Sequence, residues 1–524
     1  MRLFVSVCAI AGLSALAFGQ APDRPFDLLI VGGHVLDGTG NPWIGADLGV
    51  RDGRIVALGR LTGSKAVRTI DAGRRLVTPG FIDVHSHARE GLEGDLNHGQ
   101  PLLAQGITTA MLNPDGGGPV DLAGVRTTFE QRGIGVNAGL FVPHGSIRQK
   151  VLGMADRAPT AAELKTMVDL VTAGMKAGGV GLSSGLYYAP GSYAKTDEVI
   201  AMARAAGEFG GVYSSHIRDE GDYNIGVVAA VEEVIQIAEE GHLPGIVSHM
   251  KALGAASWGL SLPSLMRIEA ARSRGVEVWA DQYPYEASGT SITGALVPRW
   301  AQVGGDDALR KRALGAERGR LRDEIRGNIA RRGGAASLLI SRFAPDPALE
   351  GKTLADLSQS AGESPEEVAL DLLARGGAGL VSFNMNERDI DEIMTRPYTM
   401  TSTDGDLVAM GVGKPHPRAY GAFTRKLRLY VRERKVIDWP AAIRSMTHLP
   451  AMVFGLKDRG QLRVGAWADI LVFDPEKVAD KATYENPHQL SVGIDTIVVN
   501  GKLVREEGSF TGGLAGKVLA PDRR

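Results

Sequence analysis

Residues 81–87, FIDVHSH, begin the pattern that decides the fold, because a short apolar run ends there in two histidines. Alternate residues of a strand point to the same side, so His85 and His87 should project together from the strand end. Two imidazoles at this spacing can chelate one divalent metal ion, for which Zn²⁺ is the usual candidate. Seven later candidate strands also end in polar residues. They span residues 108–115, 135–144, 179–187, 211–216, 245–250, 276–283 and 398–404.

Helical stretches separate many of these strands, for example at residues 160–177, 196–209 and 223–240. Such alternation predicts an α/β protein whose parallel strands close into a (β/α)8 TIM barrel, here over residues 81–440. The polar strand ends would then share one rim of the barrel. That rim is where barrel enzymes perform their chemistry.

Two β-rich segments bracket the barrel. Residues 21–80 contain short strands and hairpin-type turns, and residues 441–524 combine a helix with similar strands. We expect the two segments to form one small β-sandwich domain. Residues 287–347 hold no clear strand and are rich in charge, which predicts a helical insertion before the last barrel strand. The insertion could act as a lid, or it could simply present a solvated charged surface.

The composition excludes several classes of protein. Of the 524 residues, 44% are hydrophobic and 23% are charged, which are globular values and argue against disorder over most of the chain. The chain has 58 basic and 60 acidic residues, so the net charge is −2. No global positive field exists to gather nucleic acid or anionic lipid, so we expect neither as a partner. The partner implied by the motifs below is a small-molecule amide substrate.

The first 20 residues, MRLFVSVCAIAGLSALAFGQ, have the character of a secretory signal peptide. Arg2 precedes an apolar stretch, and small residues precede an expected cleavage before Gln20 or Ala21. The stretch falls short of the ~20 residues that a membrane span needs, so an anchor is the less favoured alternative. Cleavage would remove Cys8, the single cysteine, and leave a secreted or periplasmic protein without disulfides or a membrane segment. The sequence does not decide the oligomeric state, and a homo-oligomer is one option.

Two more histidines, His216 and His249, also end candidate strands. Core packing gives no reason why four of the eleven histidines should fall at strand ends. We interpret them, His85 and His87 included, as ligands of one or two divalent metal ions. Asp404 ends the eighth candidate strand. A carboxylate there suits a general base that takes a proton from metal-activated water and passes it to the leaving group.

Longer motifs carry a family resemblance. The paired histidines, the two later histidines and the terminal aspartate resemble the amidohydrolase superfamily. More specific stretches are similar to the signatures of the N-acyl-D-amino-acid deacylase (D-aminoacylase) family, and they imply a β-sandwich plus barrel fold over about residues 26–505. These stretches are GLSSGLYYAPG (181–191), SHIRDE (215–220), SHMK (248–251), DQYPY (281–285) and KPHPRAYG (414–421).

One position departs from the pattern of the deacylases. They carry a metal-bridging cysteine in a GNCG loop, whereas alignment on GITT (106–109) places Asp115 there. A carboxylate can bridge two divalent cations or bind one, and as a harder ligand it tolerates Zn²⁺, Mn²⁺ or Co²⁺. The alternative for Asp115 is a plain turn residue within Pro-Asp-Gly.

The resemblance also implies a clamp for a substrate carboxylate. Lys251, Tyr285 and Arg418 would hold the α-carboxylate of an acyl-amino acid, and Tyr188 would line the pocket. An arginine offers a bidentate fork for a carboxylate. The alternative for Arg418 is a surface salt bridge.

The expected function is therefore that of a metal-dependent hydrolase. It would cleave the amide bond of N-acyl-D-amino acids or related peptide-like amides, with Asp404 as general base and then general acid. One alternative is a cyclic amidase of the dihydroorotase type, and another is an isoaspartyl or D-dipeptidase. A periplasmic binding protein that kept the fold without catalysis is a third reading.

Overall fold

Eight parallel strands form the central sheet of this computed structural model, which describes residues 24–522. Their order is β16-β12-β11-β10-β9-β8-β7-β6. The two edge strands meet through backbone bonds, since Asp404 donates to the carbonyl of His85 and His87 donates to that of Gly405. The predicted barrel is thus confirmed, strand by strand. The strands are β6 (Phe81–Asp83), β7 (Ile107–Leu112), β8 (Asn137–Pro143), β9 (Gly181–Gly185), β10 (Val212–His216), β11 (Gly245–Val247), β12 (Val278–Gln282) and β16 (Thr399–Thr401).

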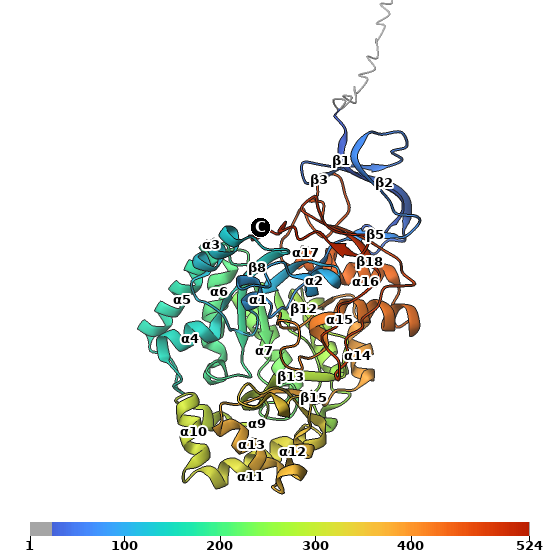
Figure 1. Cartoon of the computed structure of the whole chain (residues 1–524). Helices are drawn as coiled ribbons and strands as arrows, with labels where there is room; N and C mark the ends of the chain where they lie inside the picture. Colours follow the sequence, from blue (N-terminus) through green and yellow to red (C-terminus); the bar gives the residue numbers. More distant parts are fainter. Residues whose placement is uncertain (1–23, 523–524) are drawn as a thin grey trace, which may run out of the picture.

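Helices cover the outside of the barrel (Figure 1), because each crossover between parallel strands packs on the outer face of the sheet. In α5 (Ala161–Lys176) the side chain of Thr160 accepts from the backbone of Glu163 while the carboxylate of Glu163 accepts from the backbone of Thr160. This capping box fixes where the helix begins. The other covering helices include α1 (Arg89–Glu93), α2 (Gln100–Ala104), α3 (Leu122–Arg132), α4 (His144–Leu152), α6 (Thr196–Gly207), α7 (Val227–Gly241), α8 (Ser261–Ser273), α14 (Glu387–Met394), α15 (Arg418–Arg425), α16 (Trp439–Met446) and α17 (His448–Val453).

Both ends of the chain build a second, nine-stranded sheet. Antiparallel pairing of β5 (Leu76–Pro79) with β17 (Ile470–Phe473) joins the N-terminal strands to the C-terminal ones, so the two β-rich segments form one unit. The predicted signal peptide lies outside the described residues. The remaining strands are β1 (Phe26–Val35), β2 (Ile44–Arg51), β3 (Arg54–Gly59), β4 (Ala66–Asp71), β18 (Ile494–Val499), β19 (Lys502–Glu506) and β20 (Ser509–Phe510).

The insertion before β16 differs from the prediction in length and in content. It begins at residue 287 as expected but continues to residue 383, and it contains a three-stranded antiparallel sheet with a hydrophobic core of its own. Figure 1 shows it at the opposite end of the molecule from the terminal sheet. Its strands are β13 (Ala287–Ser291), β14 (Leu338–Arg342) and β15 (Gly379–Phe383), and its helices are α9 (Ile292–Leu296), α10 (Asp306–Leu314), α11 (Arg318–Arg331), α12 (Leu354–Ala361) and α13 (Pro365–Ala374).

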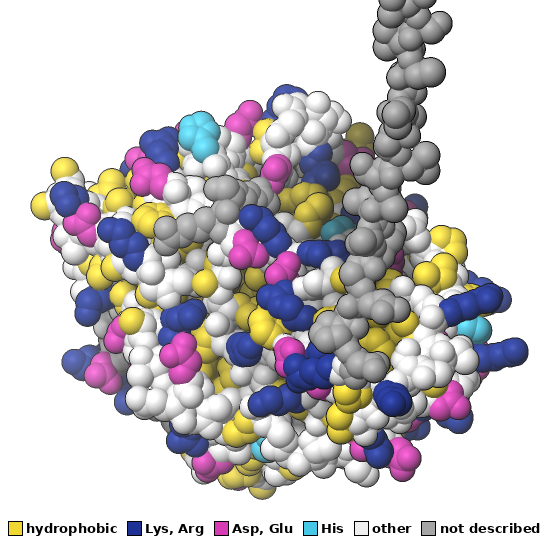
Figure 2. All heavy atoms as spheres, turned by 90° about the horizontal axis from the view of Figure 1, so that it is seen from above, with side chains coloured by type: hydrophobic (Ala, Val, Ile, Leu, Met, Phe, Trp, Pro, Cys, Tyr) yellow, Lys and Arg dark blue, Asp and Glu magenta, His cyan; other side chains and the backbone are white. Residues whose placement is uncertain are grey.

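The surface mixes both signs of charge. Figure 2 shows basic and acidic side chains interspersed over the face seen from above, with neither sign gathered into a patch. Within residues 24–522, none of the helices is both long enough and apolar enough to cross a membrane.

Lys426 is a buried amine behind the barrel wall. Its Nζ lies 2.8 Å from Oγ1 of Thr401 in β16 and 2.9 Å from Oγ of Ser445 in α16. It forms no ion pair with any carboxylate in the described part of the chain, and burial lowers its pKa to about 7.

We therefore expect Lys426→Met to stabilise the protein near pH 7 by about 1–4 kcal/mol. The folded-state pKa lies below the value of about 10.4 in an unfolded chain, so the unfolded state binds more protons between these values. The wild type should gain stability as the pH rises from 7 to 10, and the advantage of the methionine variant should shrink. Denaturant unfolding at several pH values measures this, with the exposed Lys165→Met as control. A difference that does not change with pH would contradict it.

Candidate metal centre and substrate pocket

The predicted ligands converge on one cavity of about 1210 Å³ at the carboxyl ends of the barrel strands. His87 extends from β6, His216 ends β10, and His249 follows β11. Asp115 and Asp404 follow β7 and β16. All five line the cavity, and His85 lies fully buried beside it. The barrel closure explains the convergence, because it brings the strand ends of distant segments to a common rim.

The carboxylate of Asp115 lies at the centre of four imidazoles. Its oxygens are 3.3–3.7 Å from one ring nitrogen of each histidine. One oxygen lies near His85 and His249, and the other lies near His87 and His216. Each oxygen therefore faces one of the two histidines after β6 and one of the two later histidines. The nitrogens are Nε2 of His85, His87 and His249 and Nδ1 of His216.

These side chains form two overlapping groups that could each hold a cation. One group is His85, His87, Asp115 and Asp404, and the other is Asp115, His216 and His249; within each, the ligand atoms lie within 4.8 Å of one another. Both ring nitrogens of His85 and His216 and one oxygen of Asp115 are buried without a hydrogen-bond partner among the described residues. Buried polar atoms are normally satisfied, so this donor set fits a divalent ion.

Asp404 lies beside this centre and is paired with a cation. One oxygen is 3.2 Å from Nε2 of His87, and the other is 2.8 Å from Nη1 of Arg418. Burial alone would raise the pKa of Asp404, but the Arg418 guanidinium and the neighbouring His249 hold it well below its ordinary value. The carboxylate is therefore ionised at neutral pH, as a general base must be.

The backbone is unusual where the ligands emerge. Asp115, His249 and Asp404 have φ values of 55°, 35° and 48°. Residues other than glycine seldom adopt this left-handed conformation, and it concentrates at functional sites. Ser183 of β9 supports the Asp115 loop, since its hydroxyl donates to the carbonyl of Asn113 and accepts from the backbone of residue 116.

Glu220 is a member of the site that the sequence did not reveal. Its carboxylate lies 3.2 Å from Nδ1 of His249 and 3.6 Å from Nε2 of His216, and it also pairs with Lys251. These ring nitrogens point away from Asp115, so Glu220 can fix the orientation of both imidazoles. The SHIRDE motif contained the signal, but no rule of spacing marks a carboxylate four residues after a ligand.

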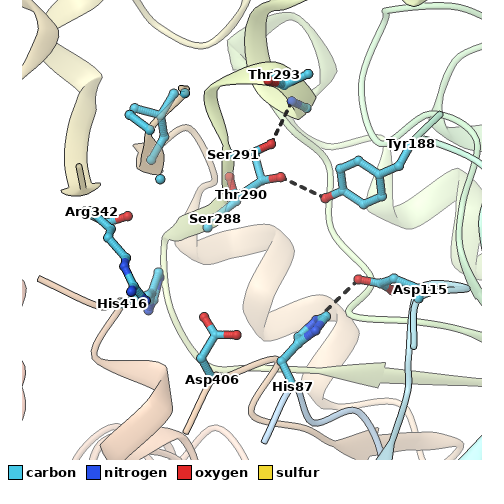
Figure 3. Close-up of a pocket in the computed structure, with 18 of the residues that line it drawn as sticks. His87, Asp115, Tyr188, Ser288, Thr290, Ser291, Thr293, Arg342, Asp406 and His416 are labelled. Carbon is cyan, nitrogen blue, oxygen red and sulfur yellow. Dashed lines mark hydrogen bonds and ion pairs between the residues drawn. The ribbon is translucent and has the colours of Figure 1, made fainter. Parts of the chain in front are cut away.

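The predicted substrate-binding residues divide into two sets. Lys251, Arg418 and Tyr188 line the cavity. Figure 3 shows Tyr188 across from Asp115 and His87, with its side chain directed toward Thr290. The hydroxyl of Tyr188 is hydrogen-bonded to that of Thr290 at 3.0 Å.

Tyr285 does not line the cavity, which corrects the prediction. It is 1% exposed and packs under the guanidinium of Arg425, 4.6 Å from the ring centroid. Tyr283 faces the cavity instead, and its ring lies 4.7 Å from the guanidinium carbon of Arg418.

Comparison with known proteins identifies the family, since the profile described as "Amidohydrolase family" matches residues 134–505. The chain belongs to the amidohydrolase family. This amidohydrolase is 35% identical to the D-aminoacylase of Alcaligenes xylosoxydans xylosoxydans, over 96% of its own length and 99% of the relative. It is 36% identical to the N-acyl-D-glutamate deacylase of the same organism, over 91% of its length and 93% of the relative.

A solved structure is also similar over nearly the whole chain. The N-acyl-D-glutamate deacylase of Bordetella bronchiseptica, complexed with zinc and a phosphonate mimic of the tetrahedral intermediate, matches with a TM-score of 0.82 at 34% identity. The match covers 95% of this amidohydrolase and 100% of that chain. The predicted fold, family and enzyme class are thus confirmed.

Proposed function

We propose that this amidohydrolase hydrolyses the amide bond of N-acyl-D-amino acids. The observation that carries the proposal is one carboxylate, Asp115, surrounded by four imidazoles, with the ionised Asp404 beside it in a cavity that also presents Lys251 and Arg418. The D series is supported by the names of the relatives, because the residues themselves require only a free carboxylate.

The metal, with zinc as the first candidate, would be held by the four histidines and Asp115. When bound, a divalent ion supplies Lewis acidity, which lowers the pKa of water and polarises a carbonyl. Asp115 belongs to both ligand groups, so its carboxylate would help to hold an ion in either of them. Glu220 keeps two of the imidazoles oriented.

Asp404 moves the proton. As an ionised carboxylate it accepts a proton from the attacking water, and it then donates this proton to the nitrogen of the departing amine. Tyr188 would stand beside the reacting amide, because it lines the cavity with its ring 4.6 Å from that of His216. Burial raises the pKa of Tyr188 well above its ordinary value, so the phenol keeps its proton and remains a hydrogen-bond donor.

A screen of N-acetyl-D- and N-acetyl-L-amino acids tests the proposal, with the metal content of the purified protein measured in parallel. We expect hydrolysis of members of the D series by a protein that contains one or two divalent ions per chain. Turnover of cyclic amides or dipeptides, with none of the N-acyl-D-amino acids cleaved, would favour the alternative amidase or peptidase.

The carboxylate clamp makes a prediction of its own. Arg418→Ala should lower kcat/KM for N-acetyl-D-methionine by about 10- to 150-fold, the effect of losing one charged hydrogen-bond partner. Arg418 also touches Asp404, so its loss could lower activity on any substrate. The deciding quantity is therefore the ratio of kcat/KM for this substrate to kcat/KM for its C-terminal amide. The wild type should discriminate against the amide and the variant should not. Equal cleavage of acid and amide by the wild type would rule out the clamp.

Export is part of the proposal and rests on residues 1–20 alone. A bacterial host that expresses the full chain should yield activity outside the cytoplasm, with an N-terminus at residue 20 or 21. Activity confined to the cytoplasm, with residues 1–20 retained, would contradict it.

A further inference from the structure

Arg332 is a buried guanidinium in the wall of the cavity and has no anionic partner. It is 2% exposed and follows α11 of the insertion. Its Nε, Nη1 and Nη2 donate to Ala295 O, Ser382 Oγ and Tyr187 OH at 3.1–3.2 Å, and all three acceptors are neutral. No carboxylate within residues 24–522 forms an ion pair with it. Of the four other buried arginines in the described residues, three have such a partner, namely Arg148 with Glu198, Arg418 with Asp404 and Arg459 with Asp469, and Arg505 has none.

The chemistry of the group makes this arrangement costly. Removing a guanidinium from water is unfavourable unless its charge is compensated. A guanidinium has five N–H groups, and the three neutral acceptors use only three of them. Two donors therefore remain at a buried cation that borders the substrate cavity, which is what an incoming anion requires.

A second cation reinforces the local charge. Arg299 lies over the ring of Tyr187, with its guanidinium carbon 4.4 Å from the ring centroid. Its Nε and Nη2 are buried and have no hydrogen-bond partner among the described residues. Tyr187 thus carries one guanidinium on its face and another, Arg332, at its hydroxyl.

Neighbouring residues connect Arg332 to both ends of the proposed substrate site. Tyr187 connects it to the metal centre, since the ring lies 5.3 Å from that of His216. Ser382 connects it to the carboxylate clamp, because Ser382 pairs with Ser288 in the β15–β13 ladder and the next residue of β13 lies against Arg418. An acyl-amino acid held at the metal centre and at the clamp has its α-carbon between these two points.

We propose that Arg332 determines specificity by binding a carboxylate in the side chain of the substrate, so that the preferred substrates are N-acyl derivatives of acidic D-amino acids. This inference rests on the proposed function and narrows it. Arg299 adds to the favourable potential through its position over Tyr187, although it does not itself line the cavity.

Two substrates of nearly equal shape test the inference. N-acetyl-D-glutamate and N-acetyl-D-glutamine have side chains of nearly the same shape that end in a carboxylate and in a neutral amide, and we expect the wild type to prefer the glutamate by at least 10-fold in kcat/KM. Arg332→Gln should lower kcat/KM for the glutamate by about 10- to 150-fold, the effect of losing a charged partner, and change that for the glutamine less than 3-fold. The control is Arg331→Gln, since this neighbour is 42% exposed and pairs with Asp222 outside the cavity.

The possible results separate the inference from the proposed function. If Arg332→Gln lowers kcat/KM equally for the glutamate and the glutamine, Arg332 only stabilises the contact between the insertion and the barrel, and the inference is wrong. If the wild type cleaves neutral N-acyl-D-amino acids without preferring the glutamate, the inference fails and the proposed function stands.

Two further measurements cover the remaining cases. If no N-acyl-D-amino acid is cleaved, equilibrium binding of the same two compounds decides, and equal affinity overturns the inference. If Arg332→Gln does not fold, Arg332→Lys replaces it. We expect the lysine variant to keep a reduced preference for the glutamate, whereas equal losses on both substrates would refute the subsite.

Discussion

Asp404→Asn is expected to lower kcat by at least 10²-fold, and by up to about 10⁴-fold, while the fold and the metal content remain unchanged. An amide cannot accept the proton of the attacking water, and it has no proton of suitable acidity for the leaving amine. Asparagine is the right replacement because it tolerates the left-handed φ of 48° at this position. Steady-state kinetics on the best N-acyl-D-amino acid, together with elemental analysis, provide the measurement.

The pKa of Asp404 also sets an expectation for the pH profile of the wild type. The pKa of Asp404 is well below its ordinary value, so the base stays ionised through the neutral range and should not itself limit kcat there. Asp406→Asn is the matched control, since this exposed carboxylate lines the same cavity and lies near His87 in Figure 3. Turnover of the Asp404 variant within a few-fold of the wild type would exclude the assigned role.

The site was largely predictable because parallel topology turns position along a strand into position in space. A polar residue at the carboxyl end of any barrel strand must lie at the same rim, however far apart the strands are in sequence. His85 and Asp404 are separated by more than 300 residues, yet the backbone of Asp404 donates to the carbonyl of His85. Strand-end positions were therefore sufficient to group the four histidines with Asp404, whereas Asp115 was assigned by alignment with the family that the motifs resemble.

The same reasoning fails where regular structure ends. Tyr283 and Tyr285 have the spacing that would put both on one face of a strand, but β12 ends at residue 282 and Tyr285 turns back to donate to the carbonyl of Tyr283. Alternation no longer applies, and only Tyr283 faces the cavity. The insertion sheet was missed because β14 and β15 are five residues each and lie among helices. A short strand becomes stable only through partners that the local sequence does not reveal.

Asp115 shows that two readings of one residue can both describe the geometry. The Pro-Asp-Gly sequence does form a tight loop, with φ at 61° for Asn113 and 55° for Asp115. That loop is also what turns the carboxylate back into the cavity, between the four imidazoles. A turn residue and a ligand are therefore compatible at this position.

Asp115→Asn is expected to weaken metal affinity by more than the 10- to 100-fold that follows loss of an orienting partner, because it removes a charge shared by both ligand groups. Activity should fall in proportion to the metal lost. Asparagine keeps the loop conformation, since it tolerates positive φ. Dialysis against a chelator followed by elemental analysis measures retention. In the wild type, retention should also fall at acidic pH, where the imidazoles bind protons in place of the metal.

Asp115→Cys tests the ligand role of this position against the turn role. The family that the motifs resemble carries a cysteine here, and a thiolate is a good zinc ligand, so this variant should hold metal far better than the asparagine variant. Asp121→Asn, at the N-terminus of α3 outside the cavity, should keep wild-type metal content and serves as control. If the asparagine variant retained the full metal content, Asp115 would be only a turn residue, and the four histidines would have to hold the ions with Asp404 alone.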